Sequence, residues 1–558
     1  MKRSLFLLSA LLLCAAMASA CKEEKPAQTE DISALFAGTP PREAYPWVWW
    51  HWMDGNISKE GIRKDLLWMN EMGIAGLHQF DAGGRNTKTL VSERIPYMSD
   101  AWKDAFRYAM SITDSLGMEV AVASSPGWSS TGGPWVPREN AMKKLVWRTV
   151  EVPGGKQEIA LPEPYSAVGY YQDLVNFKEV EPWYQDIAAV AVRLPEKDQS
   201  MTDLGAVVSS SEGKCSVDIL TDGSMNTFCL LNPAAGKEDP WVLYSFPQPQ
   251  AFKAVTTASE ILRSQFSGLP AEEHMILECS DNNTDFKEVI RIPDGVVPSK
   301  TVDFPETAAT YWRIRVLPSN AKTFHLREFV LHPVTKVNHA DEKAGFAAQP
   351  DFMQFPTPDS PDAIQNVIVL GAPAEDGKIL ADLPDGRWRV YRFGYSLTGK
   401  QNHPAGKDAT GLEVDKLDPE SWLDHFRKYL DMYKEASGGM VGQRGVQYIL
   451  TDSYEARQMT WTKNMKEEFA QRNGYDLLRW LPALTGEIID SSEKTEKFLW
   501  DWRNTLGDLF AENYDRINDI VKEYGMRGRY TEAHESGRVL VGDGMDIKMT
   551  ATVPMSAI

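Results

Sequence analysis

The chain of 558 residues is 43% hydrophobic and 25% charged, and its net charge is −19 at pH 7. This length predicts about two to four domains, and the composition is typical of a soluble globular protein. The negative charge argues against nucleic acid or an anionic membrane surface as a partner. The 18 Trp and 19 Tyr residues suit a sugar-binding cleft, although such rings are also ordinary core residues.

Residues 1–20 have the pattern of a secretory signal peptide, with a basic start and an apolar run too short to span a membrane. Cleavage before Cys21 would leave a lipid-anchored protein on the surface of a bacterial outer membrane, although Ala18 stands where such signals usually have Leu. Cleavage after Ala20 would leave a soluble periplasmic protein instead. We expect the lipid anchor, with residues 21–44 as a polar tether.

The cysteines that remain after lipidation of Cys21 are odd in number: Cys215, Cys229 and Cys279. An odd set does not pair completely, and we therefore expect no disulfide framework.

Strands and helices alternate in residues 45–145, the first part of the catalytic domain that we expect. Expected strands cover 47–52, 74–80 and 118–123, with a helix capped by Ser58 and another near 100–116 between them. Alternation at this spacing indicates parallel βαβ units.

The alternation stops between residues 146 and 410. We expect β-rich connections at 146–204 and 336–410, on either side of an inserted domain at 205–335. The order of segments in 205–335, including Leu220-Thr221-Asp222-Gly223, resembles the discoidin-type, galactose-binding-like β-sandwich. Such modules bind sugars or serve as structural elements, and both interpretations remain open here.

The β–α alternation resumes at 411–558. Helices are expected near 419–436 and 496–524, with strands near 446–452 and 526–531 and an apolar patch from 545 to 555. The fold class is therefore α/β, with a (β/α)8 TIM-barrel-type domain. We count about six strands where a barrel needs eight. We therefore expect an incomplete barrel, whose open parallel edge favours aggregation.

Polar and aromatic residues follow several of these strands. The carboxyl ends of parallel barrel strands face one cavity, so these side chains are expected to meet there. A pair of carboxyl groups suits glycoside hydrolysis, in which one protonates the leaving oxygen and the other activates water. The candidates for this cavity are His51, Trp52, Asp81, Trp128, Asp452, Tyr454, Glu455, Glu532, His534 and Glu535.

Within this set we expect Glu455 and Glu535 to be the catalytic pair, with Glu532 as the substitute. The other seven residues would bind the sugar. The alternative is structural: Glu532 or Glu535 would cap a helix or pair with Arg529 or Arg538. A hard cation such as Ca²⁺ is compatible with these oxygen ligands, but no position follows from the sequence.

Six segments of the sequence carry a family resemblance: residues 47–56, 73–82, 411–417, 452–455, 480–486 and 553–555. These segments resemble glycoside hydrolase family 106. The resemblance implies an α-L-rhamnosidase with a (β/α)8 barrel, inversion at the anomeric carbon and a calcium ion that helps to hold the sugar. Glu455 matches the family's strand-end glutamate, but Ala557 stands where the family often has an acid, which leaves the second carboxylate open.

The function that we expect is therefore removal of terminal α-L-rhamnose from a polysaccharide or glycoconjugate. Two alternatives remain open. One is a carbohydrate-binding surface lipoprotein without catalysis, and the other is a glycosidase of different sugar specificity.

Overall fold

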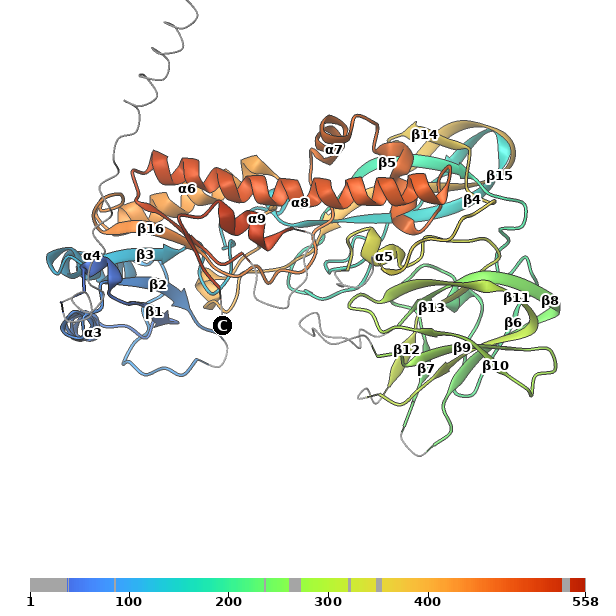
Figure 1. The fold of residues 1–558 in the computed structure, drawn as a ribbon, viewed down its shortest axis with the longest axis horizontal. Coiled ribbons are helices and arrows are strands. Elements are labelled where there is room, and N and C mark those ends of the chain that lie inside the picture. Colours follow the sequence, from blue (N-terminus) through green and yellow to red (C-terminus); the bar gives the residue numbers. More distant parts are fainter. Residues whose placement is uncertain are drawn as a thin grey trace, which may run out of the picture.

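The structure is a computed structural model, and it is mixed α/β in three parts (Figure 1). A parallel sheet and a β-sandwich-like region lie at opposite ends, and the long helix α8 extends from the parallel sheet toward a second, antiparallel sheet. The expected signal peptide, Cys21 and most of the expected tether lie outside the described residues. The structure describes residue 38 and residues 40–84, 87–234, 237–259, 272–319, 323–347, 354–533 and 542–556.

The first part is a six-stranded parallel sheet with the order β1-β2-β3-β16-β17-β18. In the described part of the chain this sheet is open, with β1 and β18 at its edges, and it does not close into a barrel. The first five strands lie where the sequence pattern predicts them, within a few residues, and β18 lies inside the expected apolar patch of residues 545–555, whose first residues form a helix. Their bounds are β1 Trp47–Met53, β2 Gly76–Ala82, β3 Glu119–Ala123, β16 Val446–Thr451, β17 Gly528–Thr531 and β18 Val553–Pro554.

Amphipathic helices separate these strands and cover one face of the sheet. The hydroxyl of Ser58 accepts a hydrogen bond from the backbone N–H of Gly61 at 3.1 Å, which caps the first helix as expected. Trp102 and Phe106 on α4 are fully buried against the sheet. The helices are α3 Lys59–Glu71, α4 Asp100–Ser115, α5 Ala340–Lys343, α6 Pro419–Ala436, α7 Met465–Asn473, α8 Ser492–Glu523 and α9 Gly544–Met549.

The second part is a four-stranded antiparallel sheet, in the order β14-β5-β15-β4. The two β-rich segments that flank the middle of the sequence pair with each other to form it. Its strands are β4 Lys143–Ala160, β5 Tyr184–Arg193, β14 Val367–Gly371 and β15 Lys378–Leu397.

The third part has a core of its own, formed by buried residues between Met201 and Leu331. Strands β10-β9-β11-β8-β13 form one antiparallel sheet, β6 pairs with β8, and β12 pairs with β7. The bounds are β6 Val207–Ser210, β7 Cys229–Leu231, β8 Trp241–Ala258, β9 Met275–Ser280, β10 Lys287–Ile292, β11 Ser299–Val316, β12 Phe324–Leu326 and β13 Glu328–His332.

This third part also corrects an expectation about cysteines. Cys215 and Cys229 form a disulfide, with their Cα atoms 5.3 Å apart, and Cys279 is free and buried. The odd count of cysteines excluded complete pairing, but it did not exclude one bond within a single module. Among the helices of the described residues, none is long and apolar enough to cross a membrane.

Candidate active site

The register of the parallel strands decides which side chains share the inner face of the sheet, the face opposite the helices. His51 on β1 pairs with Phe80 on β2, and the rings of these two residues stack with centroids 5.1 Å apart. Thr451 on β16 pairs with Thr531 on β17. Asp452 and Glu532 are the next residues of these two strands. Because side chains alternate along a strand, both acids turn to the same face and lie next to each other.

Three acids meet at the carboxyl ends of β16 and β17, and we call Asp452, Glu455 and Glu532 the carboxyl cluster. Asp452 and Glu532 are buried. Burial, and next the hydrogen bond and negative charge of Glu532, raise the pKa of Asp452 to about 8, with a smaller contribution from Glu455. The cluster therefore holds a proton at neutral pH.

Glu455 is the accessible member of the carboxyl cluster, with its side chain 21% exposed. The hydroxyl of Ser453 donates a hydrogen bond to Glu455 Oε1 at 3.1 Å, which fixes one of the two carboxyl oxygens. The other oxygen, Oε2, lies 3.8 Å from Nε2 of His403. An accessible carboxyl group beside buried acids is an arrangement that acid–base chemistry uses.

Aromatic rings continue this face toward β1. Trp128, 42% exposed, donates a hydrogen bond from its Nε1 to Nε2 of His51 at 3.0 Å. Burial lowers the pKa of His51, so its imidazole is neutral at pH 7. Trp49 is also exposed, and its ring lies 4.8 Å from that of Phe80. The strand pattern marked His51 and Trp128, whereas Trp49 was missed, although it stands two residues before His51 and so shares its face.

Trp52 does not line this site, and the expectation for it is wrong. It is 1% exposed and packs edge-on against Trp102 and Phe106 of α4. The reason is the alternation of side chains in a strand: Trp52 follows His51 directly, so it points to the helix-covered face.

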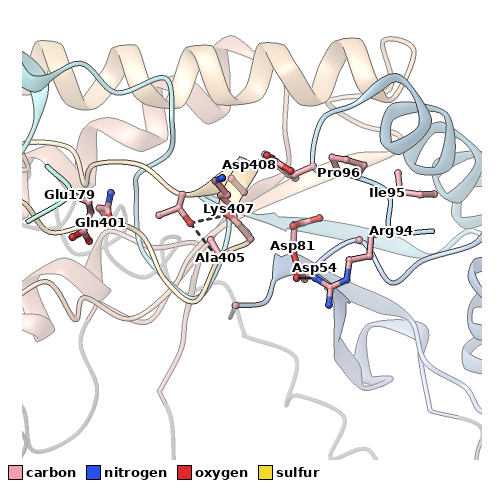
Figure 2. Close-up of a pocket in the computed structure, with 16 residues that line it drawn as sticks. Asp54, Asp81, Arg94, Ile95, Pro96, Glu179, Gln401, Ala405, Lys407 and Asp408 are labelled. Atoms are coloured by element: carbon pink, nitrogen blue, oxygen red, sulfur yellow. Dashed lines mark hydrogen bonds and ion pairs between the residues drawn. The ribbon is translucent and has the colours of Figure 1, made fainter. Parts of the chain in front are cut away.

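Asp81 is also turned away from the carboxyl cluster, because it pairs in register with Trp52. Nε1 of Trp102 donates a hydrogen bond to Asp81 Oδ2 at 2.9 Å. Burial raises the pKa of Asp81 to about 7, against the opposing effect of that hydrogen bond. Asp81 lines a separate cleft of about 810 Å³, where Figure 2 shows it near Asp54 and Arg94.

Tyr454 is buried, which corrects the expectation that it contacts a sugar. Its ring packs edge-on against Phe510 of α8, with centroids 5.0 Å apart, and its hydroxyl donates to the backbone oxygen of Arg457. Tyr454 therefore supports the loop that carries Glu455. His534 and Glu535, the last two predicted site residues, lie outside the described residues.

A buried ion pair holds two loops together beside the cluster. Glu413 Oε2 accepts hydrogen bonds from Thr131 Oγ1 at 2.6 Å and from Lys416 Nζ at 2.7 Å. Burial, the largest single influence, raises the pKa of Glu413, but the charge and hydrogen bond of Lys416, the hydrogen bond of Thr131 and the charge of Lys400 together lower it below its ordinary value. Through its Oε2 atom, Glu413 joins the loop of residues 411–417 to the loop of residues 124–133.

The comparison with known families agrees with this geometry. The sequence profile of a family described as α-L-rhamnosidase, glycoside hydrolase family 106, matches residues 38–558. The chain belongs to glycoside hydrolase family 106. The segments that carry the resemblance in the sequence include residues 452–455, which supply Asp452 and Glu455, and the strand that carries His51, whereas Glu532 lies outside them.

Two relatives extend the comparison. A solved structure of a rhamnosidase from Novosphingobium sp. PP1Y is 36% identical and superimposes with a TM-score of 0.82, covering 92% of this chain and 48% of that one. A protein of Formosa agariphila named "Putative beta-glucuronidase" is 26% identical over 505 residues, which are 89% of this chain and 30% of the relative. The chain therefore spans about half or less of the length of these two relatives.

Proposed function

We propose that this protein is a glycoside hydrolase that removes terminal α-L-rhamnose from a polysaccharide or glycoconjugate. The observation that carries the proposal is the carboxyl cluster at the ends of two neighbouring parallel strands, in a chain of family 106. The mechanism that we propose is inversion with two carboxyl groups, one acting as acid and the other as base toward water.

Glu455 is the first of the two reacting groups in this proposal, because it is the accessible acid of the cluster. The second is Glu532 or Glu535. Asp452 supports them, since its raised pKa keeps a proton beside Glu455 and Glu532 at neutral pH. General acid catalysis needs such a proton near the leaving oxygen.

The sugar would lie between the carboxyl cluster and the rings on β1 and the loop after β3. The exposed face of Trp128 suits the apolar C–H face and methyl group of a 6-deoxy sugar. The neutral imidazole of His51 can exchange hydrogen bonds with a sugar hydroxyl once Trp128 releases Nε2 or through its other nitrogen.

We also propose that the parallel sheet is part of a (β/α)8 barrel and that the β-sandwich-like region is an insertion between β3 and β16. Six parallel strands with helices between them support the barrel, as does a polar cluster at their carboxyl ends. The separate core of residues 201–331 supports the insertion. Whether that region binds sugar is left to a glycan-binding assay on the isolated module.

Calcium and the lipid anchor are further proposals. The described residues offer one close group of three His, Cys, Asp or Glu ligand atoms, formed by Glu272, His274 and Asp294, far along the chain from the carboxyl cluster. Since Ca²⁺ takes about six to eight oxygen ligands, this group does not fit the expected sugar-site ion, and no step is assigned to a metal.

A Cys21→Ala variant that stays membrane-bound would contradict the lipid anchor.

The decisive experiment is release of L-rhamnose from an aryl α-L-rhamnoside by the full protein. NMR should detect β-L-rhamnose as the first anomer, because inversion places the new hydroxyl on the opposite face. Glu455→Gln should lower kcat by about 10²–10⁴-fold, whereas Glu435→Gln, at an exposed position of α6, should not. An aryl β-glucuronide belongs in the same panel because of the Formosa relative's name; hydrolysis of that substrate alone would overturn the sugar assignment.

A further inference from the structure

His403 lies on the loop between β15 and α6, a stretch in which the sequence pattern marked no site residue. Its side chain is 44% exposed, and its Nε2 is 3.8 Å from Glu455 Oε2. Because Ser453 binds Glu455 Oε1, the two oxygens of this carboxyl group each face a different neighbour. His403 therefore lies beside Oε2 of Glu455, on the side of the carboxyl group away from Ser453.

The backbone of His403 is held firmly by the loop of residues 124–133. The backbone N–H of Trp128 donates to His403 O at 3.0 Å, and the N–H of His403 donates to Ser129 Oγ at 2.9 Å. A Cβ on Gly127 would meet the carbonyl of His403 at 2.7 Å, so glycine permits this close approach. The Nδ1 atom of the ring lies 3.5 Å from Ser129 Oγ. The loop of residues 124–133 therefore positions the imidazole as well as the backbone of His403.

Charged groups reach the imidazole from its own loop, which carries Lys400 and Glu413, and from the loop after β16, which carries Glu455. Burial, and next the charge of Lys400, lower the pKa of His403, while Glu413 and Glu455 act in the opposite direction. The loop of residues 124–133 contributes no charged side chain. His403 is consequently neutral at pH 7 and becomes a cation only below its ordinary pKa.

We propose that His403 is a positioning residue for Glu455. In its neutral form the imidazole keeps the Glu455 carboxyl group directed toward the sugar, and on protonation it draws the carboxylate into an ion pair and out of the reaction. The inference rests on the proposed function, in which Glu455 reacts. According to this inference, protonation of His403, and not of the carboxyl groups, causes part of the loss of activity at acid pH.

The contact itself is tested without activity, by following the ¹³Cε1–H signal of His403 in a pH titration by NMR, with the signal assigned from His403→Gln. Removing the negative charge in Glu455→Gln should lower the pKa of His403 by about 0.3–0.7 pH unit, as expected for one partly exposed ion pair. An unchanged titration would overturn the proposal, even if the protein hydrolyses no rhamnoside.

The role is tested by the pH dependence of kcat/KM on an aryl α-L-rhamnoside. His403→Gln should lower kcat about 10–100-fold at pH 7, as for a misplaced catalytic group, with KM little changed, and its acid limb should move to lower pH. His325→Gln, in β12 of the distant β-sandwich-like region, is the control and should behave as wild type. If His403→Gln does not fold, Ser129→Ala should show the same shift in weaker form.

The outcomes separate the two proposals. A wild-type protein that releases no L-rhamnose contradicts the proposed function, while the NMR titration still decides whether His403 and Glu455 interact. A folded His403→Gln with wild-type kcat and a wild-type acid limb contradicts the positioning role, whatever the substrate proves to be.

Discussion

Thr451 and Thr531 face each other in the parallel strands β16 and β17, with their Oγ1 atoms 2.8 Å apart. The next residue of each strand is an acid, and the N–H of Glu532 donates to Thr451 O at 3.0 Å, which extends the register by one step. Neighbouring carboxyl groups resist simultaneous ionisation. Together with burial, this register explains why the pKa of Asp452 rises to about 8.

The first prediction concerns Glu532. Glu532→Gln keeps the shape of the side chain but removes its charge, so the pKa of Asp452 should fall and its proton should be lost at a lower pH. If Glu532 is the second reacting group, kcat on an aryl rhamnoside should fall by about 10²–10⁴-fold. Near-full turnover by a folded Glu532→Gln protein would leave Glu535 as the second carboxylate.

The second prediction concerns stability and pH. The folded-state pKa of Asp452, about 8, lies above its unfolded value of about 3.9. Ionisation therefore favours the unfolded state, and the protein should lose stability as pH rises from about 4 to about 8. Asp452→Asn, which cannot ionise, should raise Tm at pH 8, with a gain that shrinks toward pH 4. The exposed Asp424→Asn is the control. An equal gain in the Tm of Asp452→Asn at both pH values would contradict the raised pKa of Asp452.

The order of elements and the strand ends that carry the candidate site could be predicted from the sequence, because apolar runs and helix caps are local signals. Ser58 and the strand beginning at Trp47 are examples. The face that a strand residue uses is less evident when both faces are buried. His51 and Trp52 are neighbours in an aromatic run, and only packing against α4 assigns Trp52 to the core.

Residues that reach the site from long loops gave no such signal. His403 follows no strand end, and its position depends on hydrogen bonds to the loop of residues 124–133, more than 270 positions earlier in the chain. Asp81 stood at a strand end as expected, but its register with Trp52 turned it toward Trp102. Contacts between distant segments decide both cases, and a single sequence does not contain them explicitly.

The third prediction contrasts two tryptophans that the strand pattern had treated alike. Trp128→Ala should raise KM for an aryl rhamnoside and leave Tm nearly unchanged, because the ring is exposed and its indole N–H donates a hydrogen bond to the His51 side chain. Trp52→Ala should instead destabilise the fold by about 3–5 kcal/mol, the usual cost of a cavity left by a buried aromatic ring. Calorimetry and steady-state kinetics on both variants check this, and an unchanged KM for Trp128→Ala would contradict its place in the sugar pocket.

The fourth prediction concerns a buried ion network between the β-sandwich-like region and the antiparallel sheet. Lys336, just after β13, donates to Glu487 Oε2 at 2.8 Å and to Asp198 Oδ2 at 3.4 Å, and Arg389 of β15 also pairs with Glu487. Burial raises the pKa of Asp198, but Lys336 and Arg389 outweigh it and bring the pKa to about 2. Both carboxylates therefore depend on these cations for their charge.

Lys336→Met should leave buried carboxylates without compensation, at a cost of about 3–5 kcal/mol. The matched control is Lys378→Met on β15, whose partners Glu158 and Asp376 are exposed and whose loss should leave stability nearly unchanged, because water screens exposed ion pairs. Urea denaturation at pH 7 measures both. The deficit of Lys336→Met should shrink at low pH, since protonation of Asp198 and Glu487 removes the uncompensated charge. Equal stability of the two variants at pH 7 would show that the network does not hold the two regions together.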